Sequence, residues 1–205
     1  MDQKFWNRFA FIYDRFMKKD QKAYEEMYIL IRKCIQDKNV LELATGTGLI
    51  AKHVADVTKQ MEAADYAESM IKQAKKGTYS SKLRFSVEDA CHLSYASDSF
   101  DVVLISNALH IMPEPQRALQ ETRRVLKPEG ILIAPTFIHG SMSPVKKFFG
   151  WLMGLAGFHA KHKWTAEEYV DFLHANGWKI KKKRVLAATF PLMYVEAMIS
   201  SQRIK

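Results

Sequence analysis

The 205-residue sequence predicts a single α/β domain with a mostly parallel sheet and an antiparallel pair of strands at one edge. Three observations lead to this prediction. An apolar strand pattern over residues 39–44 runs into a turn of small residues and then into a helical pattern. Strand and helix patterns alternate from there to about residue 137, which implies right-handed crossovers and parallel strands. Two long strand patterns follow near the end of the chain with no helix between them, as expected for an antiparallel edge pair.

The composition fits one globular domain over residues 1–205. Hydrophobic residues make up 48% of the chain and charged residues 26%, and the length allows a substantial core. No apolar run reaches about 18 residues, so we expect no membrane-spanning helix, and the charged amino terminus does not look like a secretory signal. The two cysteines, Cys34 and Cys91, predict neither a disulfide framework nor a metal site. We therefore expect a cytoplasmic protein without a bound metal.

Two helical segments are expected before the first strand, within residues 1–36. The first, over residues 5–16, is rich in aromatic side chains, and the second covers residues 21–35. The aromatic residues that fall at helical spacing in the first segment are Trp6, Phe9 and Tyr13. Two interpretations of this segment stay open: a helix packed on the core, or a lid over a ligand site.

The turn after the first strand carries the most informative residues. Its sequence, E-L-A-T-G-T-G over residues 42–48, leads into a helix predicted over residues 48–57. Gly46 and Gly48 allow a tight turn and a close approach of a ligand to bare backbone, as in nucleotide-shaped cofactor sites at the carboxyl end of a first strand. Glu42 adds to this, because a carboxylate inside the strand suits a cofactor that carries an ammonium group and not a phosphate.

The next two strands lead to acidic residues at the same edge of the sheet. The strand predicted over residues 60–66 contains Asp65, nineteen residues after Gly46, where an acid can accept hydrogen bonds from both ribose hydroxyls. The strand predicted over residues 83–88 is followed by Asp89. The other elements expected in this region are helices over residues 67–76 and 114–126 and strands over residues 100–107 and 130–137, the last one preceded by a turn at residues 127–130.

The carboxyl-terminal part begins with a helix from Thr165. Thr165 and Glu168 form a capping box at its start, and Asn176-Gly177 ends it. Two strands are then predicted, over residues 178–188 and 192–201. Along the first of them the lysines alternate, so we expect one solvent-facing row on an edge strand, made of Lys179, Lys181 and Lys183.

Four motifs in this order resemble those of the class I S-adenosylmethionine-dependent methyltransferases. They are E-L-A-T-G-T-G, A-D-Y-A-E-S-M, E-D-A-C-H-L-S-Y-A-S-D-S-F-D-V-V and L-K-P-E-G, and the resemblance covers roughly residues 39–137. Within this class the chain is most similar to the small enzymes that methylate quinone precursors or phosphatidylethanolamine, since F-A-F-I-Y-D over residues 9–14 resembles their tyrosine-aspartate motif. The resemblance implies a Rossmann-like, seven-stranded sheet with helices on both faces.

The resemblance also implies S-adenosyl-L-methionine as the cofactor and assigns its contacts. Glu42 takes the methionyl ammonium, Asp65 the ribose hydroxyls and Asp89 the adenine amino group. Tyr13 closes over the sulfonium, whose charge attracts a ring face. The other cofactor-binding residues that we expect are Ala44, Gly46, Gly48, Tyr66, Ala90 and Asn107. Ala44 departs from the family, which usually has glycine there, and its methyl group is expected to be tolerated if φ stays negative.

Catalytic residues are less clearly indicated. A methyl group held in line with a nucleophile needs orientation above all, so a general base is optional. His110 follows the fourth strand and His139 follows the fifth, both at the edge where ligands bind in such sheets. A neutral imidazole there could accept a proton near pH 7. The alternative for both residues is a structural histidine.

The region 138–164 is expected to be a cap inserted after the fifth strand. Within it, residues 146–163 place aromatic and apolar side chains between lysines, and the whole chain carries a net charge of +9. One interpretation is a cap that covers the substrate pocket. The other is an interfacial segment that contacts a membrane peripherally, which would bring the protein to the inner membrane face.

The predicted activity is transfer of a methyl group to a small, lipophilic acceptor, either a quinol precursor or a phospholipid headgroup. A methyltransferase of a soluble metabolite and a non-catalytic S-adenosylmethionine-binding module stay open. The spacing Gly46-x-Gly48-x-x-Ala51 also fits a dinucleotide fingerprint, but no Tyr-x-x-x-Lys motif follows the fourth strand. No nucleic-acid partner is expected, because the N/D-P-P-Y/F type of signature for base methylation is absent and the basic residues lack interleaved stacking aromatics in the core of the domain.

Overall fold

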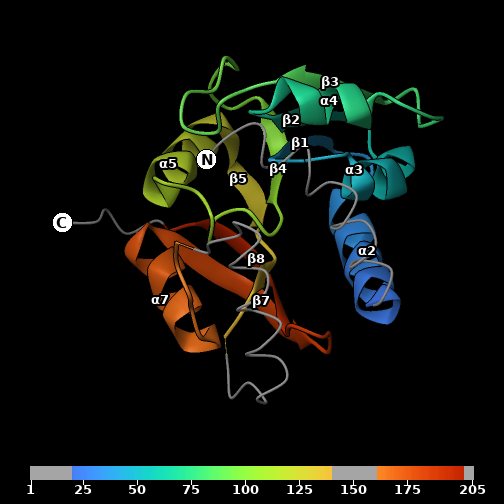
Figure 1. Cartoon of the computed structure of the whole chain (residues 1–205). Helices are drawn as coiled ribbons and strands as arrows, with labels where there is room; N and C mark the ends of the chain where they lie inside the picture. The colour runs from blue at the N-terminus through green and yellow to red at the C-terminus, as the bar shows by residue number, and fades with distance from the viewer. Residues whose placement is uncertain (1–19, 140–160, 201–205) are drawn as a thin grey trace.

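The computed structural model describes residues 20–139 and 161–200, which form one twisted sheet with helices on both faces (Figure 1). The strands are β1 (Asn39–Leu43), β2 (Gln60–Asp65), β3 (Leu83–Val87), β4 (Phe100–Ile105), β5 (Leu126–Ile133), β6 (Thr136–Phe137), β7 (Trp178–Leu186) and β8 (Leu192–Ile199). The helices are α2 (Gln21–Ile35), α3 (Leu49–Val54), α4 (Glu68–Ala74), α5 (Pro115–Val125) and α7 (Ala166–Ala175), with a 3₁₀ turn at Ala55–Val57.

The strand order confirms the predicted Rossmann-like sheet. It is β3-β2-β1-β4-β5-β8, with β7 on the far side of β8 and β6 beside β8 in line with β5. The pairs among β1 to β5 are parallel, whereas β8 runs antiparallel to β5 and to β7. Because β6 continues the line of β5 after Pro135, which has no N–H to donate, the eight labelled strands correspond to seven predicted ones.

Each face of the sheet has its own core. On one face α2, α3 and α4 cover side chains such as Val40 and Val102, and on the other α5 and α7 cover Leu41 and Val103. Successive residues of β1 and of β4 thus point to opposite cores. Helices cover both faces of the sheet, which explains why these strands are apolar along almost their whole length. The helix over residues 21–35 belongs to the first core, while residues 1–19 of the expected lid lie outside the described residues.

The start of the fifth strand differs from the prediction. We expected a turn at residues 127–130 and a strand after it, but β5 already begins at Leu126, which pairs with Phe100. The register then shifts, so that Val102 pairs with Ile131. The residues expected to form a turn therefore form an irregularity inside the strand, because pairing to β4 begins before them.

Two local predictions at the carboxyl-terminal part have different outcomes. The capping box of α7 is confirmed: the Glu168 N–H donates to Thr165 Oγ1 at 3.2 Å, and the Thr165 N–H donates to Glu168 Oε2 at 2.8 Å.

The lysines of β7 are exposed as expected, but a bulge at Lys181 breaks their alternation. Lys179 and Lys183 therefore point to opposite faces of the edge strand, and the prediction of a single row was wrong.

Candidate cofactor site

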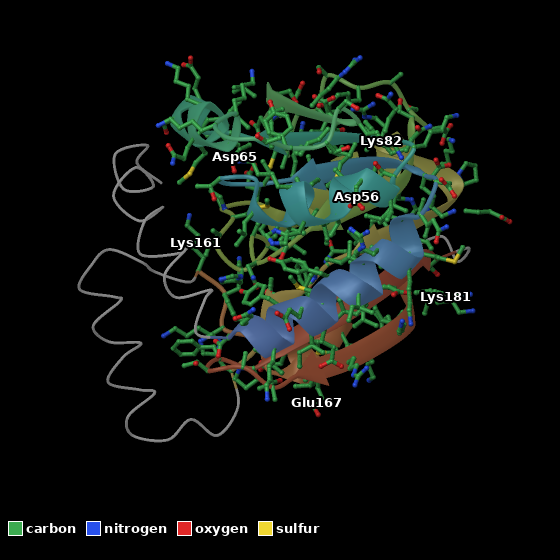
Figure 2. The ribbon with its side chains drawn as sticks, turned by 90° about the vertical axis from the view of Figure 1, so that its right-hand side faces the viewer. Asp56, Asp65, Lys82, Lys161, Glu167 and Lys181 are labelled. Carbon is green, nitrogen blue, oxygen red and sulfur yellow. The ribbon has the colours of Figure 1, made fainter. Side chains whose placement is uncertain are left out.

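The carboxyl ends of β1, β2, β3 and β4 meet at one edge of the sheet because these strands are parallel neighbours. Figure 2 shows Asp65 and Lys161 toward this side of the molecule, and Asp56, Lys82 and Lys181 toward the opposite side. Glu42 and Asp65 lie in the last two residues of β1 and β2, and Asp89 and Asn107 each lie two residues after the end of β3 and β4. The topology thus brings together side chains from four separate parts of the sequence.

The turn between β1 and α3 winds through residues with positive φ. Gly46 has φ 58° and Gly48 has φ 75°, which glycine adopts without the steric penalty of a Cβ. A Cβ added at Gly46 would meet no atom within 4 Å, whereas one at Gly48 would lie 2.8 Å from the ring of Phe85. Gly46 therefore leaves its backbone open to a ligand, and Gly48 allows the turn to pack against the end of β3.

Ala44 lies in the same turn with φ 56°. The expectation of a negative φ at this position was wrong. The Thr45 N–H donates to Ala64 O at 2.9 Å and so fixes the direction of the chain just after Ala44. A left-handed alanine costs about 1–2 kcal/mol relative to the right-handed region, and this cost explains why a glycine would suit the position.

Asp65 is the polar centre of the turn. Its Oδ2 accepts the Gly46 N–H at 2.8 Å and its Oδ1 accepts the Ala67 N–H at 2.9 Å. Burial raises the pKa of this carboxyl, while the two N–H groups oppose the shift. Each carboxylate oxygen can accept a further hydrogen bond, so Asp65 can bind a pair of ligand hydroxyls while it holds the turn.

Glu42 lies below the turn and is almost completely buried, with 2% of its surface exposed. Its Oε2 accepts the hydroxyl of Thr45 at 2.7 Å. Burial raises the pKa of Glu42 to about 8, the hydrogen bonds from Thr45 and the Ala51 N–H oppose the rise, and the nearby charge of Asp65 adds to it. A positively charged group at this edge would favour the ionised carboxylate.

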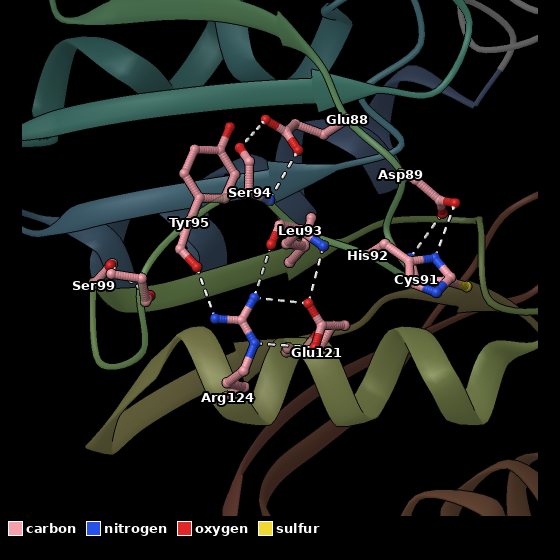
Figure 3. A network of polar contacts seen from close by, with 12 residues as sticks. Glu88, Asp89, Cys91, His92, Leu93, Ser94, Tyr95, Ser99, Glu121 and Arg124 are labelled. Carbon is pink, nitrogen blue, oxygen red and sulfur yellow. Dashed lines mark hydrogen bonds and ion pairs between the residues drawn. The ribbon is translucent and has the colours of Figure 1, made fainter.

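The segment after β3 forms a compact loop around Asp89. The Cys91 N–H donates to Asp89 Oδ1 at 2.8 Å, and the His92 N–H donates to Asp89 O at 2.9 Å. Figure 3 shows this loop lying against α5, whose Glu121 and Arg124 contact its main chain. About half of the Asp89 side chain is exposed, so its carboxylate is accessible, and Ala90 beside it is partly buried.

Asn107 occupies the turn after β4 with φ 51°. Its N–H donates to Pro135 O at 2.8 Å, and its Nδ2 donates to the hydroxyl of Tyr24 on α2 at 3.4 Å. Among the described residues its Oδ1 is buried without a hydrogen-bond partner. A buried acceptor left without a donor is costly, and a ligand N–H or O–H would satisfy it.

Of the two tyrosines expected at the cofactor, only Tyr66 lies in the described part of the chain. Tyr66 follows β2 but is 71% exposed, so its side chain faces solvent in the described structure. Tyr13 lies outside the described residues. The sequence analysis in turn missed Thr45 and Tyr24, which bond to Glu42 and Asn107. Thr45 could have been found from its place three residues after Glu42, whereas nothing in the sequence connects Tyr24 to a residue 83 positions away.

The two histidines named as base candidates lie side by side beyond β4 and β6. His110 is 3% exposed, and its Nδ1 lies 3.1 Å from the hydroxyl of Thr136. Burial lowers the pKa of His110 to about 4, helped by His139 and His162, and burial also lowers the pKa of His139. Both rings are therefore neutral at pH 7, but a low pKa also makes His110 a weak base.

The donor set fits a cofactor that combines an ammonium group, a ribose and an adenine. Buried acids suit its positive charge, Asp65 can accept from two hydroxyls, and Gly46 leaves space for close approach. The carboxylates of Glu42 and Asp65 would repel a phosphate bound beside this turn. The geometry thus favours the cofactor implied by the motifs over a dinucleotide.

Comparison with solved structures defines the class of the fold. A methyltransferase solved in complex with the Trm112 methyltransferase activator of Haloferax volcanii superposes with a TM-score of 0.80, at 16% identity, over 99% of both chains. The [4+2]-cyclase SpnF superposes with a TM-score of 0.71 at 19% identity, over 89% of this chain and 84% of that one. The protein has the class I S-adenosylmethionine-dependent methyltransferase fold.

Comparison of the sequences shows which proteins the chain is similar to. Residues 41–134 match the family described as "Methyltransferase domain". The demethylmenaquinone methyltransferase of Renibacterium salmoninarum is 34% identical over 115 residues, which cover 56% of this chain and 48% of that protein. Residues 41–134 are thus similar to methyltransferase domains, and the chain spans about half the length of the curated relatives it matches.

Proposed function

We propose that the protein transfers a methyl group from S-adenosylmethionine to a small, lipophilic acceptor, with a quinol precursor as the first candidate. The observation that carries the first half of the proposal is Asp65. Its Oδ2 accepts the Gly46 N–H of the turn after β1, its Oδ1 accepts the Ala67 N–H just before α4, and the space beside Gly46 is open. The fold alone carries less weight, because one structural neighbour is named as a cyclase.

Each polar residue of the site has a separate role in holding the cofactor. Asp65 accepts the ribose hydroxyls and Asp89 accepts from the adenine amino group. Asn107 Oδ1 accepts from the methionyl part, and the charge of Glu42 balances the ammonium group. When bound, S-adenosylmethionine supplies a methyl group already activated for attack, so the protein's main task is to align the acceptor and exclude water.

The acceptor side contains aromatic rings that suit an apolar, planar molecule. The rings of His110 and Phe137 are 6.1 Å apart, and those of His162 and Trp164 stack at 5.1 Å. The low pKa of His110 makes complete removal of a proton from the acceptor unfavourable. The name of the demethylmenaquinone relative supports a quinol, whereas a phospholipid headgroup has no comparable support.

Binding of the donor is tested by calorimetry on the purified protein. We expect S-adenosylhomocysteine to bind with micromolar affinity and NAD to give no heat. The Asp65→Ala variant should lose most of this affinity. Binding heat from NAD, with no binding heat from S-adenosylhomocysteine, would contradict the proposal.

The acceptor is tested with methyl-labelled S-adenosylmethionine and three acceptors. They are a demethylmenaquinol with a short isoprenoid tail, the same naphthoquinol ring without a tail, and vesicles containing phosphatidylethanolamine. Label should enter the tailed quinol fastest. Label in the tailless ring alone would instead favour a soluble acceptor, and no label in any of them despite tight donor binding would favour a binding module.

Contact with a membrane is a separate part of the proposal. Among the described residues no helix is long and apolar enough to cross a bilayer. Residues 146–160 of the proposed contact segment lie outside the described residues, and Lys161 and Lys163 at its end are exposed. We expect sedimentation with anionic vesicles and weaker sedimentation at high salt. A protein that stays in the supernatant with all vesicles would leave only the pocket-cap interpretation.

A further inference from the structure

Side chains of α5 hold the main chain of the loop that carries Asp89, and the loop itself buries few residues. Between Glu88 and Ser99 only Leu93 is fully buried. Arg124 donates through Nη1 to Tyr95 O at 2.7 Å and through Nη2 to Leu93 O at 2.9 Å. The Leu93 N–H donates to Glu121 Oε2 at 2.9 Å. Three main-chain groups of the loop are therefore held by one ion pair (Figure 3).

Glu121 and Arg124 also hold each other. Arg124 donates through Nε to Glu121 Oε1 at 3.0 Å and through Nη2 to Oε2 at 2.7 Å. Their side chains are only 21% and 34% exposed. A two-point arginine–carboxylate contact fixes direction as well as distance, so the pair acts as a rigid bracket between the helix and the loop.

A shift of Leu93 and Tyr95, the two loop residues that the bracket holds, would also move the Asp89 carboxylate. Asp89 lies four residues before Leu93, and the intervening chain is tied into one turn by the contacts of Asp89 with Cys91 and His92. A second arginine, Arg117, donates to Cys91 O at 3.4 Å and contacts His92 from a more exposed position. The turn is thus attached to α5 at two places, through Arg117 at its own residues and through the bracket at Leu93 and Tyr95.

Attachment of α5 itself does not depend on these two residues. The helix buries its other side in the core through Pro115, Ala118, Leu119, Thr122 and Val125. Glu121 and Arg124 make three hydrogen bonds to main-chain atoms of the loop and two to each other. The helix does not need these bonds to stay in place. The bracket therefore serves the position of the loop.

We propose that Glu121 and Arg124 are positioning residues that set the selectivity of the site for adenine, by holding the Asp89 carboxylate where it meets the adenine amino group. The inference rests on the proposed cofactor. Adenine presents an N–H donor to the carboxylate, whereas hypoxanthine presents a carbonyl oxygen at the same position, which a carboxylate repels. If the loop is loosened, Asp89 keeps its charge, but the distance between its carboxylate and the base is no longer fixed. Discrimination between adenine and hypoxanthine should therefore fall.

The experiment measures the affinities of each protein for S-adenosylhomocysteine and for its analogue with hypoxanthine in place of adenine. We expect the unaltered protein to prefer adenine about 10-fold or more, as a site built for one hydrogen bond to a charged group does. Arg124→Lys keeps the charge but cannot reach both carbonyls, and the preference should fall at least about threefold. Because both ligands are compared on the same protein sample, the ratio does not depend on the folded fraction.

Arg32→Lys is the matched control. Arg32 is 35% exposed, pairs with Asp56 through both guanidinium nitrogens and also donates to a main-chain carbonyl, that of His53, but it lies away from the site. Its preference for adenine should equal that of the unaltered protein. Glu121→Gln, which keeps the side-chain shape and loses the charge that holds Arg124, should shift the ratio in the same direction as Arg124→Lys.

The outcomes separate this inference from the proposed function. An unaltered protein that binds neither ligand would overturn both. An unaltered protein that binds both ligands equally would keep the cofactor site and overturn the role of the Asp89 loop. Retention of the full preference in Arg124→Lys and Glu121→Gln, whatever happens to their overall affinity, would show that the bracket is structural only.

Discussion

Replacement of Glu42 by glutamine should remove a pH dependence from the stability of the protein. The pKa of Glu42 is raised to about 8 in the folded state, chiefly by burial, against an ordinary value of 4.5. Between these two values the folded state binds more protons than the unfolded state, so the free energy of unfolding falls as pH rises. Below about pH 4.5 the Glu42 carboxyl is neutral in both states, so its ionisation does not lower the free energy of unfolding.

The size of the effect follows from the width of that window. One pKa unit corresponds to about 1.4 kcal/mol, so the Glu42 contribution should fall by about 2–3 kcal/mol between pH 5 and pH 7. In Glu42→Gln the amide keeps an acceptor for the Thr45 hydroxyl or the Ala51 N–H but carries no charge. The variant should therefore match the unaltered protein near pH 4.5 and exceed its stability at pH 8.

Urea denaturation at pH 5, 6.5 and 8 measures this difference. The comparison of the two proteins isolates Glu42, because the other titrating groups, including Asp65 with its raised pKa, are present in both. S-adenosylhomocysteine, whose ammonium group offsets the buried charge, should reduce the difference at pH 8. Parallel stability curves for the two proteins over the whole range would refute the reasoning.

Three other substitutions test the turn. Ala44→Gly removes a Cβ at φ 56° and should stabilise the protein by up to about 1 kcal/mol in urea denaturation, whereas a loss of stability would show that the methyl group packs usefully. Gly48→Ala should cost more stability than Gly46→Ala, because only the former brings a Cβ within 2.8 Å of Phe85; equal melting temperatures would contradict this. Asp65→Ala should weaken binding of S-adenosylhomocysteine and also lower the melting temperature, since two main-chain hydrogen bonds worth about 1 kcal/mol each are lost; unchanged melting would mean that the turn does not need them.

Much of the fold could be predicted because its determinants are local. The capping box of α7 depends on Thr165 and Glu168 alone, and the succession of strands and helices along the chain follows from the alternating apolar patterns. The meeting of Asp65 with Gly46 could also be predicted, because parallel strands bring their carboxyl ends to one edge. In each of these cases the sequence spacing itself carries the geometry.

Other features depend on contacts between distant residues and left no sign in the sequence. The positive φ of Ala44 follows from the bond of its neighbour Thr45 to Ala64 on β2. The bulge at Lys181 depends on how β7 pairs with β8. Glu121 and Arg124, three residues apart on a helix, look like an ordinary surface ion pair until the loop from β3 is seen against them.

Several departures from ordinary protein structure lie at the edge of the sheet that carries the candidate site. Ala44 and Asn107 have positive φ, Glu42 is a buried acid, and Asn107 Oδ1 is buried without a partner among the described residues. Each of these features costs stability, and such costs persist where function requires them. A ligand with a positive charge and hydrogen-bond donors would relieve the cost at Glu42 and Asn107 together. The unfavourable features of the site are thus themselves evidence for the charge and the donors of the molecule that it binds.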